Sequence, residues 1–277
     1  MEIDGIFDSH AHYFDRRFAS EYPGGADALL RELLPHPVSR IINVGTNPEN
    51  SRAAIAQAAE HPGMFAAAGI HPEDCHTLTD PEAALADLRG LLGDAESRRR
   101  DKIVALGEIG LDYHYETYGE LPLDRAKEMA FFEAQLELAE ALDLPVIIHD
   151  REAHGDCFEA VLRHPGVRGV FHSYSGSAEM AHELVRRGWY ISFSGTLTFG
   201  NATRVREAAG AVPRDRLLVE TDAPYLAPHP KRGHLNHSGL LVYTLGTLAE
   251  IWGCTAQEAA RMTSENAENL FGIRNFV

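Results

Sequence analysis

Eight short apolar runs divide the chain, and helical patterns fill the segments between them. The runs are Gly5–Asp8, Arg40–Val44, Phe65–Ala68, Ile103–Gly107, Pro145–Ile148, Gly169–Phe171, Trp189–Phe193 and Leu217–Val219. Most are continuously apolar rather than alternating, which is typical of parallel strands buried on both faces. Eight strands in strict alternation with helices predict an α/β fold, a single (β/α)8 TIM barrel over residues 1–277. The main alternative is a doubly wound open sheet.

Helical stretches separate the runs and continue past the last one. Those between the runs are Ala26–Leu34, Asn50–Glu60, Pro81–Leu92, Leu123–Leu142, Glu152–Arg163, Ser177–Arg187 and Asn201–Gly210. Two further stretches, Gly239–Trp252 and Thr255–Leu270, predict C-terminal helices after the barrel. Thr255 and Glu258 have the spacing of a capping box at the start of the last helix.

The composition is that of an ordinary globular protein, with 44% hydrophobic and 24% charged residues among 277. The three cysteines, Cys75, Cys157 and Cys254, are far apart and form no CxxC motif, so we expect reduced thiols and a cytoplasmic location. The start of the chain lacks the features of a signal peptide, and no run is long enough to span a membrane. We therefore expect no membrane partner, and no obligate protein partner is evident.

The formal net charge of −16 constrains any nucleic-acid partner. A protein that grips duplex DNA across a broad face usually carries a basic patch, whereas this chain repels polyanions. The charge therefore favours single-stranded DNA, a chain end or a small phosphoester entering a local site. The basic run 98–102 is either a weak patch or a solvated loop before a strand.

Six potential metal ligands follow the ends of apolar runs. They are His10, His12, Glu108, His149, His172 and Asp222. Residues two apart in a strand face the same way, so the first two histidines project together. A closed barrel brings all six to its C-terminal mouth, where barrel enzymes place catalysis. Imidazole and carboxylate ligands suit Zn, Mg, Mn, Fe or Ni, so the pattern predicts a metal-dependent hydrolase.

Other histidines do not follow strands. His36, His61, His164 and His182 lie in loops or helical stretches, and we expect them at the surface. Asp8, two residues before His10, is better explained as a structural group, or as a group that orients a ligand imidazole, than as a ligand itself.

The chain resembles the TatD family of metal-dependent hydrolases, which belongs to the amidohydrolase-like barrels. The matching segments, in family order, are Asp8-Ser-His-Ala-His12, Gly69-Ile-His-Pro72, Gly107-Glu-Ile-Gly-Leu-Asp-Tyr113, His149-Asp-Arg151, His172-Ser-Tyr-Ser-Gly176, Glu220-Thr-Asp-Ala-Pro-Tyr-Leu226 and Thr263–Phe271. The resemblance implies two divalent metal ions and a deoxyribonuclease or related phosphodiesterase activity. It assigns His10, His12 and Asp222 to one ion and His149 and His172 to the other, with Glu108 bridging.

Two positions depart from the family pattern. Ser173 stands where the family commonly has Cys, and Asn236-His-Ser238 stands where it often has Asn-Glu-Pro. Neither change removes a predicted ligand, and both fall near the expected substrate rim.

The expected chemistry is attack of a metal-activated water on a phosphodiester, with Asp222 and Glu108 as catalytic residues. Asp222 is either the general base or a ligand only. The first alternative function is a C–N or ester hydrolase of the same barrel group, acting on a cyclic amide or an aminoacyl-tRNA type of substrate. The second is a metal-binding module without catalytic activity.

Several residues near the predicted mouth are candidate substrate contacts, each with a structural alternative. Arg151 could clamp a phosphate or pair with Asp150 or Glu152. His71 could donate to a phosphate or be structural. Candidates on loops are Arg232, a rim contact or a solvated residue, and Tyr113, Tyr115 and Tyr225, which stack bases or pack.

Overall fold

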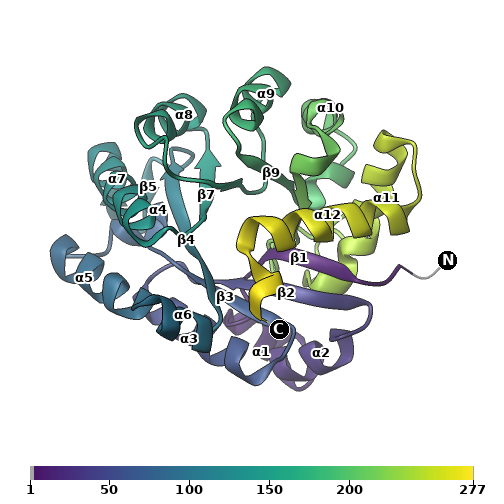
Figure 1. Ribbon diagram of the computed structural model, residues 1–277, viewed down its shortest axis with the longest axis horizontal. Helices are drawn as coiled ribbons and strands as arrows, with labels where there is room; N and C mark the ends of the chain where they lie inside the picture. Colours follow the sequence, from purple (N-terminus) through teal and green to yellow (C-terminus); the bar gives the residue numbers. More distant parts are fainter. Residues whose placement is uncertain (1–2, 277) are drawn as a thin grey trace.

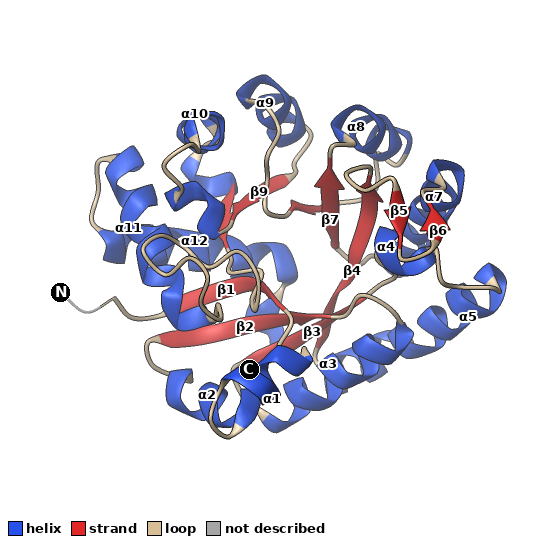
Figure 2. Cartoon of the chain, turned by 180° about the vertical axis from the view of Figure 1, so that it is seen from behind, coloured by secondary structure: helices blue, strands red, loops and turns tan. Residues whose placement is uncertain are grey.

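The computed structural model describes residues 3–276, in which eight parallel strands form a nearly closed barrel surrounded by helices (Figure 1). The strands, in ring order, are β1 (Ile6–Ala11), β2 (Val38–Val44), β3 (Met64–Ala68), β4 (Ile103–Asp112), β7 (Val146–Arg151), β8 (Gly169–Phe171), β9 (Tyr190–Phe193) and β10 (Leu217–Val219). The prediction of a TIM barrel is confirmed. Each strand is mostly buried because helices cover the outside of the barrel (Figure 2).

The ring closes at its mouth, where β1 meets the segment that follows β10. The His12 amide donates to the Ala223 carbonyl at 2.7 Å, and the Asp222 amide donates to the His10 carbonyl at 2.9 Å. Asp8 strengthens this junction, since its buried carboxylate accepts from the amide and the hydroxyl of Thr221 at 2.9 and 2.6 Å. Closure therefore places residues from the two ends of the chain beside each other.

Helices follow the strands in the predicted order. They are α1 (Arg16–Glu21), α2 (Gly25–Leu33), α3 (Pro48–Glu60), α4 (Pro72–Cys75), α5 (Pro81–Leu92), α6 (Ala95–Arg100), α7 (Arg125–Leu142), α8 (His154–Arg163), α9 (Ala178–Arg186), α10 (Thr203–Ala211), α11 (Leu241–Trp252) and α12 (Ala256–Phe271). The capping box of Thr255 and Glu258 is present. Leu270 and Phe271 of α12 join an apolar cluster of strand residues, so this helix seals part of the core (Figure 1). No helix in residues 3–276 is long and apolar enough to cross a membrane.

Three of the strands in the structure extend further than the sequence predicts. β1, β4 and β7 continue through the candidate ligands because backbone pairing does not stop where the apolar run stops: Gly110 pairs with His149, and Asp112 pairs with Arg151. Gly110 is required here, since it has a φ of +143° and a Cβ would lie 1.9 Å from the His149 carbonyl oxygen. The segment between β4 and α7 contains a short hairpin, β5 (Thr117–Tyr118) with β6 (Leu121–Pro122).

The surface assignment of two histidines is wrong. His61 and His164 are 6% and 8% exposed. The His61 ring lies 3.2 Å from Asp27, and the His164 ring lies 2.5 Å from Glu133. A carboxylate partner offsets the free-energy cost of burying a polar ring. A helical sequence pattern does not reveal such a partner.

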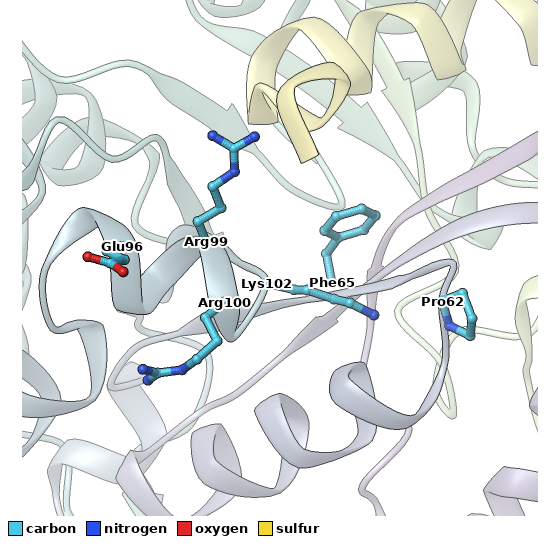
Figure 3. A pocket seen from close by; sticks show the side chains of 6 residues that line it. All are labelled: Pro62, Phe65, Glu96, Arg99, Arg100 and Lys102. Atoms are coloured by element: carbon cyan, nitrogen blue, oxygen red, sulfur yellow. The ribbon is translucent and has the colours of Figure 1, made fainter. Parts of the chain in front are cut away.

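The basic run 98–102 is not a simple loop, because its first three residues belong to α6, and a weak nucleic-acid patch there stays a prediction. Arg98 donates to the Gly93 carbonyl at 2.8 Å, and Lys102 donates to the Ala58 carbonyl at 2.7 Å, so both satisfy carbonyls at helix ends. Residues of this run line a hollow of about 430 Å³ together with Phe65. Figure 3 shows the Arg99 and Phe65 side chains pointing toward the C-terminal helical segment. Arg100 pairs with Asp101 at 2.8 Å. At least three of these cations are therefore committed to protein groups.

Candidate metal centre

Four candidate ligands from β1, β4 and the segment after β10 converge at the mouth of the barrel. The Nε2 atoms of His10 and His12 lie 3.0 Å apart. The His10 Nε2 lies 3.3 Å from Oε2 of Glu108, and the His12 Nε2 lies 3.3 Å from Oδ1 of Asp222. The expectation that the two histidines project together holds, and the chain ends meet here because the barrel closes.

A second pair of histidines lies on the other oxygen of the same glutamate. The Glu108 Oε1 atom is 2.7 Å from Nε2 of His172 and 2.8 Å from Nδ1 of His149. One carboxylate oxygen thus faces the His10 and His12 pair while the other faces the second pair. This is the arrangement that a carboxylate bridging two cations requires.

The outer nitrogens of three rings are fixed by acceptors, which decides where their lone pairs point. The His12 Nδ1 donates to the Val44 carbonyl at 2.6 Å. The His172 Nδ1 donates to Glu220 at 3.1 Å, and the His149 Nε2 donates to Asp112 at 3.1 Å. In the neutral rings the remaining nitrogen of each carries a lone pair aimed at the centre. These lone pairs and the carboxylate oxygens have no hydrogen-bond donor between them, and they are the ligand atoms that a divalent cation takes. The residues therefore fit the metal ions that the sequence predicts.

In the metal-free protein, the carboxylates of the site favour the protonated, positively charged form of His149 and His172. Burial opposes the charged form of His149, but hydrogen bonds with Asp112 and Glu108 raise its pKa to about 9. Burial likewise opposes charge on His172, whose pKa the carboxylates of Glu108 and Glu220 nevertheless raise well above its ordinary value. The surrounding histidines hold the pKa of Glu108 well below its usual range, although burial acts in the opposite sense.

A cavity of about 820 Å³ opens above the six candidate ligands, within the size range of small-molecule sites. Its wall contains seven carboxylate side chains and one arginine, Arg151. The carboxylates are Asp15, Glu73, Asp74, Glu108, Asp112, Asp150 and Asp222. The site is therefore a small acidic chamber whose charge bound cations would offset.

Comparisons with known proteins identify the family of this chain. The family model described as TatD related DNase matches residues 7–272. The chain belongs to this family. A Bacillus subtilis relative, the uncharacterized metal-dependent hydrolase YabD, is 36% identical over 97% of this chain and 99% of its own length. The Escherichia coli uncharacterized metal-dependent hydrolase YcfH is 34% identical over 97% of this chain and 96% of its own.

Solved structures add the fold. The crystal structure of the TatD homolog YjjV from Escherichia coli superposes with a TM-score of 0.84 at 30% identity, covering 96% of this chain and 98% of that one. The chain is thus a metal-dependent hydrolase of the TatD family, with a cluster of residues at the barrel mouth that could hold metal ions.

His71 differs from the four other histidines of this TatD-family site. Its Nδ1 accepts the Glu73 amide at 3.1 Å, so the proton of the neutral ring is on Nε2, which lies 3.5 Å from Glu108 Oε1. A ring in this tautomer presents a donor to the cavity rather than a lone pair. His71 therefore fits a substrate contact better than a metal ligand.

Arg151 also lines the cavity, and its expected alternative partners have other contacts. Its Nη1 lies 3.8 Å from Asp112, and its guanidinium lies 5.0 Å from the centroid of the Tyr115 ring. Asp150 instead contacts His154, at 2.8 Å. Among the described residues, Arg151 forms no ion pair with Asp150 or with Glu152, because it faces Asp112 and because Glu152 contacts His114 at 2.6 Å.

Two other candidates lie away from the cavity wall. Arg232 is exposed and packs its guanidinium 4.3 Å from the centroid of the Phe199 ring. Tyr113 donates its hydroxyl to Asp156 at 2.8 Å and packs against Arg125, so it has a structural role. The sequence alone does not distinguish Arg232 and Tyr113 from Tyr115 and Tyr225, which line the cavity.

Sequence reasoning missed the groups that hold the rings. Asp112 lies four residues after Glu108 on the same strand, and Glu220 lies two residues before Asp222; the strand periodicity of two was the available signal. Asp8, in contrast, does not touch the His10 ring: it accepts from the backbone amide of His10 at 3.3 Å, and the ring Nδ1 has no hydrogen-bond partner.

The two departures from the family pattern have distinct places. Ser173 lines the cavity and its hydroxyl lies 2.9 Å from that of Ser194. Asn236 is fully buried and donates to the carbonyls of Thr221 and Tyr225 at 2.9 and 2.6 Å, so it holds the segment after β10.

Proposed function

We propose that this TatD-family hydrolase cleaves phosphodiester bonds as a deoxyribonuclease, acting on single-stranded DNA, chain ends or small phosphoesters. The observation that carries the proposal is the division of the Glu108 oxygens between two histidine pairs. We assign His10, His12 and Asp222 to one ion and His149 and His172 to the other. Two divalent ions held there would supply a water of lowered pKa and would offset negative charge on the phosphoryl oxygens.

The chain's own groups then have defined tasks. Asp222 is the more exposed of the two candidate carboxylate ligands, because 15% of its side chain is accessible against 4% for Glu108. It therefore faces the cavity. Burial opposes its ionisation, but the neighbouring histidines hold its pKa below the ordinary value, so it is a carboxylate able to accept a proton from the attacking water. Glu108 positions both histidine pairs.

Two neighbours orient the phosphoryl group. The Nε2–H of His71 points toward the cavity, and Arg151 lines the wall beside Asp112. We assign the two side chains to phosphoryl oxygens, where a guanidinium forms two charge-assisted hydrogen bonds. The acidic wall favours a short strand end over a duplex. The three free cysteines fit a reducing compartment, so we propose a cytoplasmic location.

The decisive experiment pairs a 3′-labelled single-stranded oligonucleotide with a panel of amides and carboxylic esters, each with Mg, Mn or Zn. We expect nucleotide release that is lost in Glu108→Ala and reduced by roughly 10²- to 10⁴-fold in Asp222→Asn, the usual contribution of a general base. Metal content is measured in every variant. Asp222→Asn with both ions and full turnover would refute the base assignment. Turnover of amides or aminoacyl esters with an intact oligonucleotide would replace this function with a C–N or ester hydrolase.

A further inference from the structure

Exposed aromatic rings gather at the mouth of the barrel. Among the described residues, Tyr115, Leu121 and Tyr225 are the large apolar side chains with the greatest exposure, at 44%, 43% and 45%. Both tyrosines line the cavity above the candidate ligands. Large exposed rings at a cavity rim indicate recognition of an apolar or aromatic ligand surface.

The two tyrosines stand on opposite sides of the site. Tyr115 follows β4 and Tyr225 follows β10, which are the fourth and eighth strands of the ring. In a ring of eight, these positions are half a turn apart. Glu108 belongs to the fourth strand, and Asp222 lies beside the eighth, so the candidate metal centre is between the two rings.

Each ring is held by its own contacts. The Tyr225 hydroxyl donates to Asp15 at 2.6 Å, and the guanidinium of Arg17 lies 5.9 Å from the ring centroid. The Tyr115 ring lies against Arg151 and meets Tyr118 edge-on at 5.9 Å. Side chains held in this way lose little conformational entropy when a ligand binds, which favours stacking.

The hairpin that follows Tyr115 is anchored to β4, the strand that carries Glu108. The Tyr118 hydroxyl donates to the Asp112 carbonyl at 2.9 Å, and its ring stacks on His76 at 4.6 Å. Asp112 in turn holds the His149 ring. The segment next to Tyr115 is therefore anchored through Asp112 to a residue that contacts a candidate ligand.

The charge of the cavity selects among aromatic ligands. With seven carboxylates and a single arginine in the wall, long stretches of phosphate are disfavoured outside the metal centre. A volume of about 820 Å³ admits a small ligand with few phosphates. A short piece of single strand offers flat bases on both sides of one phosphodiester.

We propose that Tyr115 and Tyr225 form a two-sided platform that stacks the nucleobases on either side of the scissile phosphodiester, so that the recognised unit is a dinucleotide within a single strand. This inference rests on the proposed phosphodiesterase function and names its substrate unit. Base stacking on aromatic side chains is tolerant of base identity, so the platform gives little sequence preference.

The test uses the dinucleotide TpT and two analogues, each with one base replaced by hydrogen. Removing either base lowers kcat/KM of the wild-type enzyme by roughly 5- to 150-fold, the range for stacking of one base. In Tyr225→Leu and Tyr115→Leu the dependence on one base disappears, a different base in each variant. Tyr115→Phe and Tyr225→Phe restore it, because the ring remains.

Tyr22→Leu is the matched control, since Tyr22 lies in the loop before α2 and donates its hydroxyl to Glu32, away from the cavity wall. It keeps the dependence on both bases. Leucine variants that keep full dependence on both bases overturn the platform while the phosphodiesterase function stands.

Failure of the underlying function gives a different result. The proposed function is wrong if neither the labelled oligonucleotide nor any dinucleotide is cleaved with Mg, Mn or Zn. In that case, equilibrium binding of the same three dinucleotides to the metal-loaded protein decides the platform. Base-dependent binding that the leucine substitutions abolish supports it. Binding that ignores the bases, or no binding of TpT, overturns it.

Discussion

Replacing Asp112 with Asn tests whether a carboxylate outside the metal ligands fixes one half of the candidate centre. Asp112 uses both oxygens: Oδ1 accepts the His114 amide at 2.9 Å, and Oδ2 accepts the His149 Nε2–H at 3.1 Å. Asn has one acceptor, so its NH₂ group must face one of two donors. We expect Asp112→Asn to weaken one metal site and leave the other intact.

The magnitude follows from the lost hydrogen bond. A buried donor left without its acceptor costs about 1–3 kcal/mol, or roughly 5- to 150-fold in a binding constant. This range contains the roughly 10- to 100-fold loss typical when the outer partner of a ligand histidine is removed. The loss belongs to the ion assigned to His149 and His172, because the outer nitrogen of His12 is held by the Val44 carbonyl.

The assay is competition between the protein and a chromogenic chelator for Zn, which resolves two binding steps. The matched control is Asp150→Asn, a carboxylate of the same cavity that contacts His154 and no candidate ligand. Equal loss at both steps in Asp112→Asn, or unchanged binding at both, would refute the reasoning. A loss of similar size in the control would show that total charge decides affinity rather than the fixed imidazole.

Three further outcomes are expected. Gly110→Ala lowers the free energy of unfolding by several kcal/mol, or prevents folding, because its Cβ would overlap a backbone oxygen. Urea denaturation measures this change, and an unchanged midpoint would contradict the close packing of β4 on β7. Chelation lowers the thermal midpoint and Zn or Mn restores it, with about 2.7 kcal/mol of stabilisation at 100 times the dissociation constant; identical midpoints would exclude a bound ion under those conditions. Burial raises the pKa of Asp8 from 3.8 to about 6, so its contribution to stability is complete below pH ~4 and is lost as the pH rises through about 6, by about 3 kcal/mol. Urea unfolding of the metal-stripped protein should show this loss in the wild type and not in Asp8→Asn, and parallel curves would contradict it.

The fold could be predicted because each strand is short, apolar and buried on both faces, which leaves a continuous signal in the sequence. The ends of the strands could not, since the extension of β4 through Asp112 depends on pairing with β7, and a polar residue in that pairing looks like a loop. Residue spacing brought the six candidate ligands together because a parallel barrel turns position along a strand into position at the mouth.

Contacts between distant segments were out of reach for the same reason. His12 is oriented by a carbonyl of β2, and His172 is oriented by Glu220, 48 residues away in the chain. The sequence also does not show which side chains are exposed. Three tyrosines near the mouth look alike in sequence, yet Tyr113 donates its hydroxyl to Asp156 while Tyr115 and Tyr225 line the cavity. Local sequence fixes which groups are present, and tertiary packing decides which of them face a ligand.

Charge balance links the metal-free and metal-loaded forms of the site. Glu108 and Asp222 at the centre, with Asp112 and Glu220 behind the rings, supply four carboxylates in a mostly buried volume. The two divalent ions that we propose would carry four positive charges, so a centre loaded in this way would be close to neutral with uncharged imidazoles. Without ions, Asp112 and Glu108 raise the pKa of His149 to about 9 against the opposing effect of burial, so that a proton supplies positive charge there. Metal binding must therefore displace protons from the rings that the outer carboxylates hold in place, and those carboxylates both orient the ligands and set the competition between ions and protons.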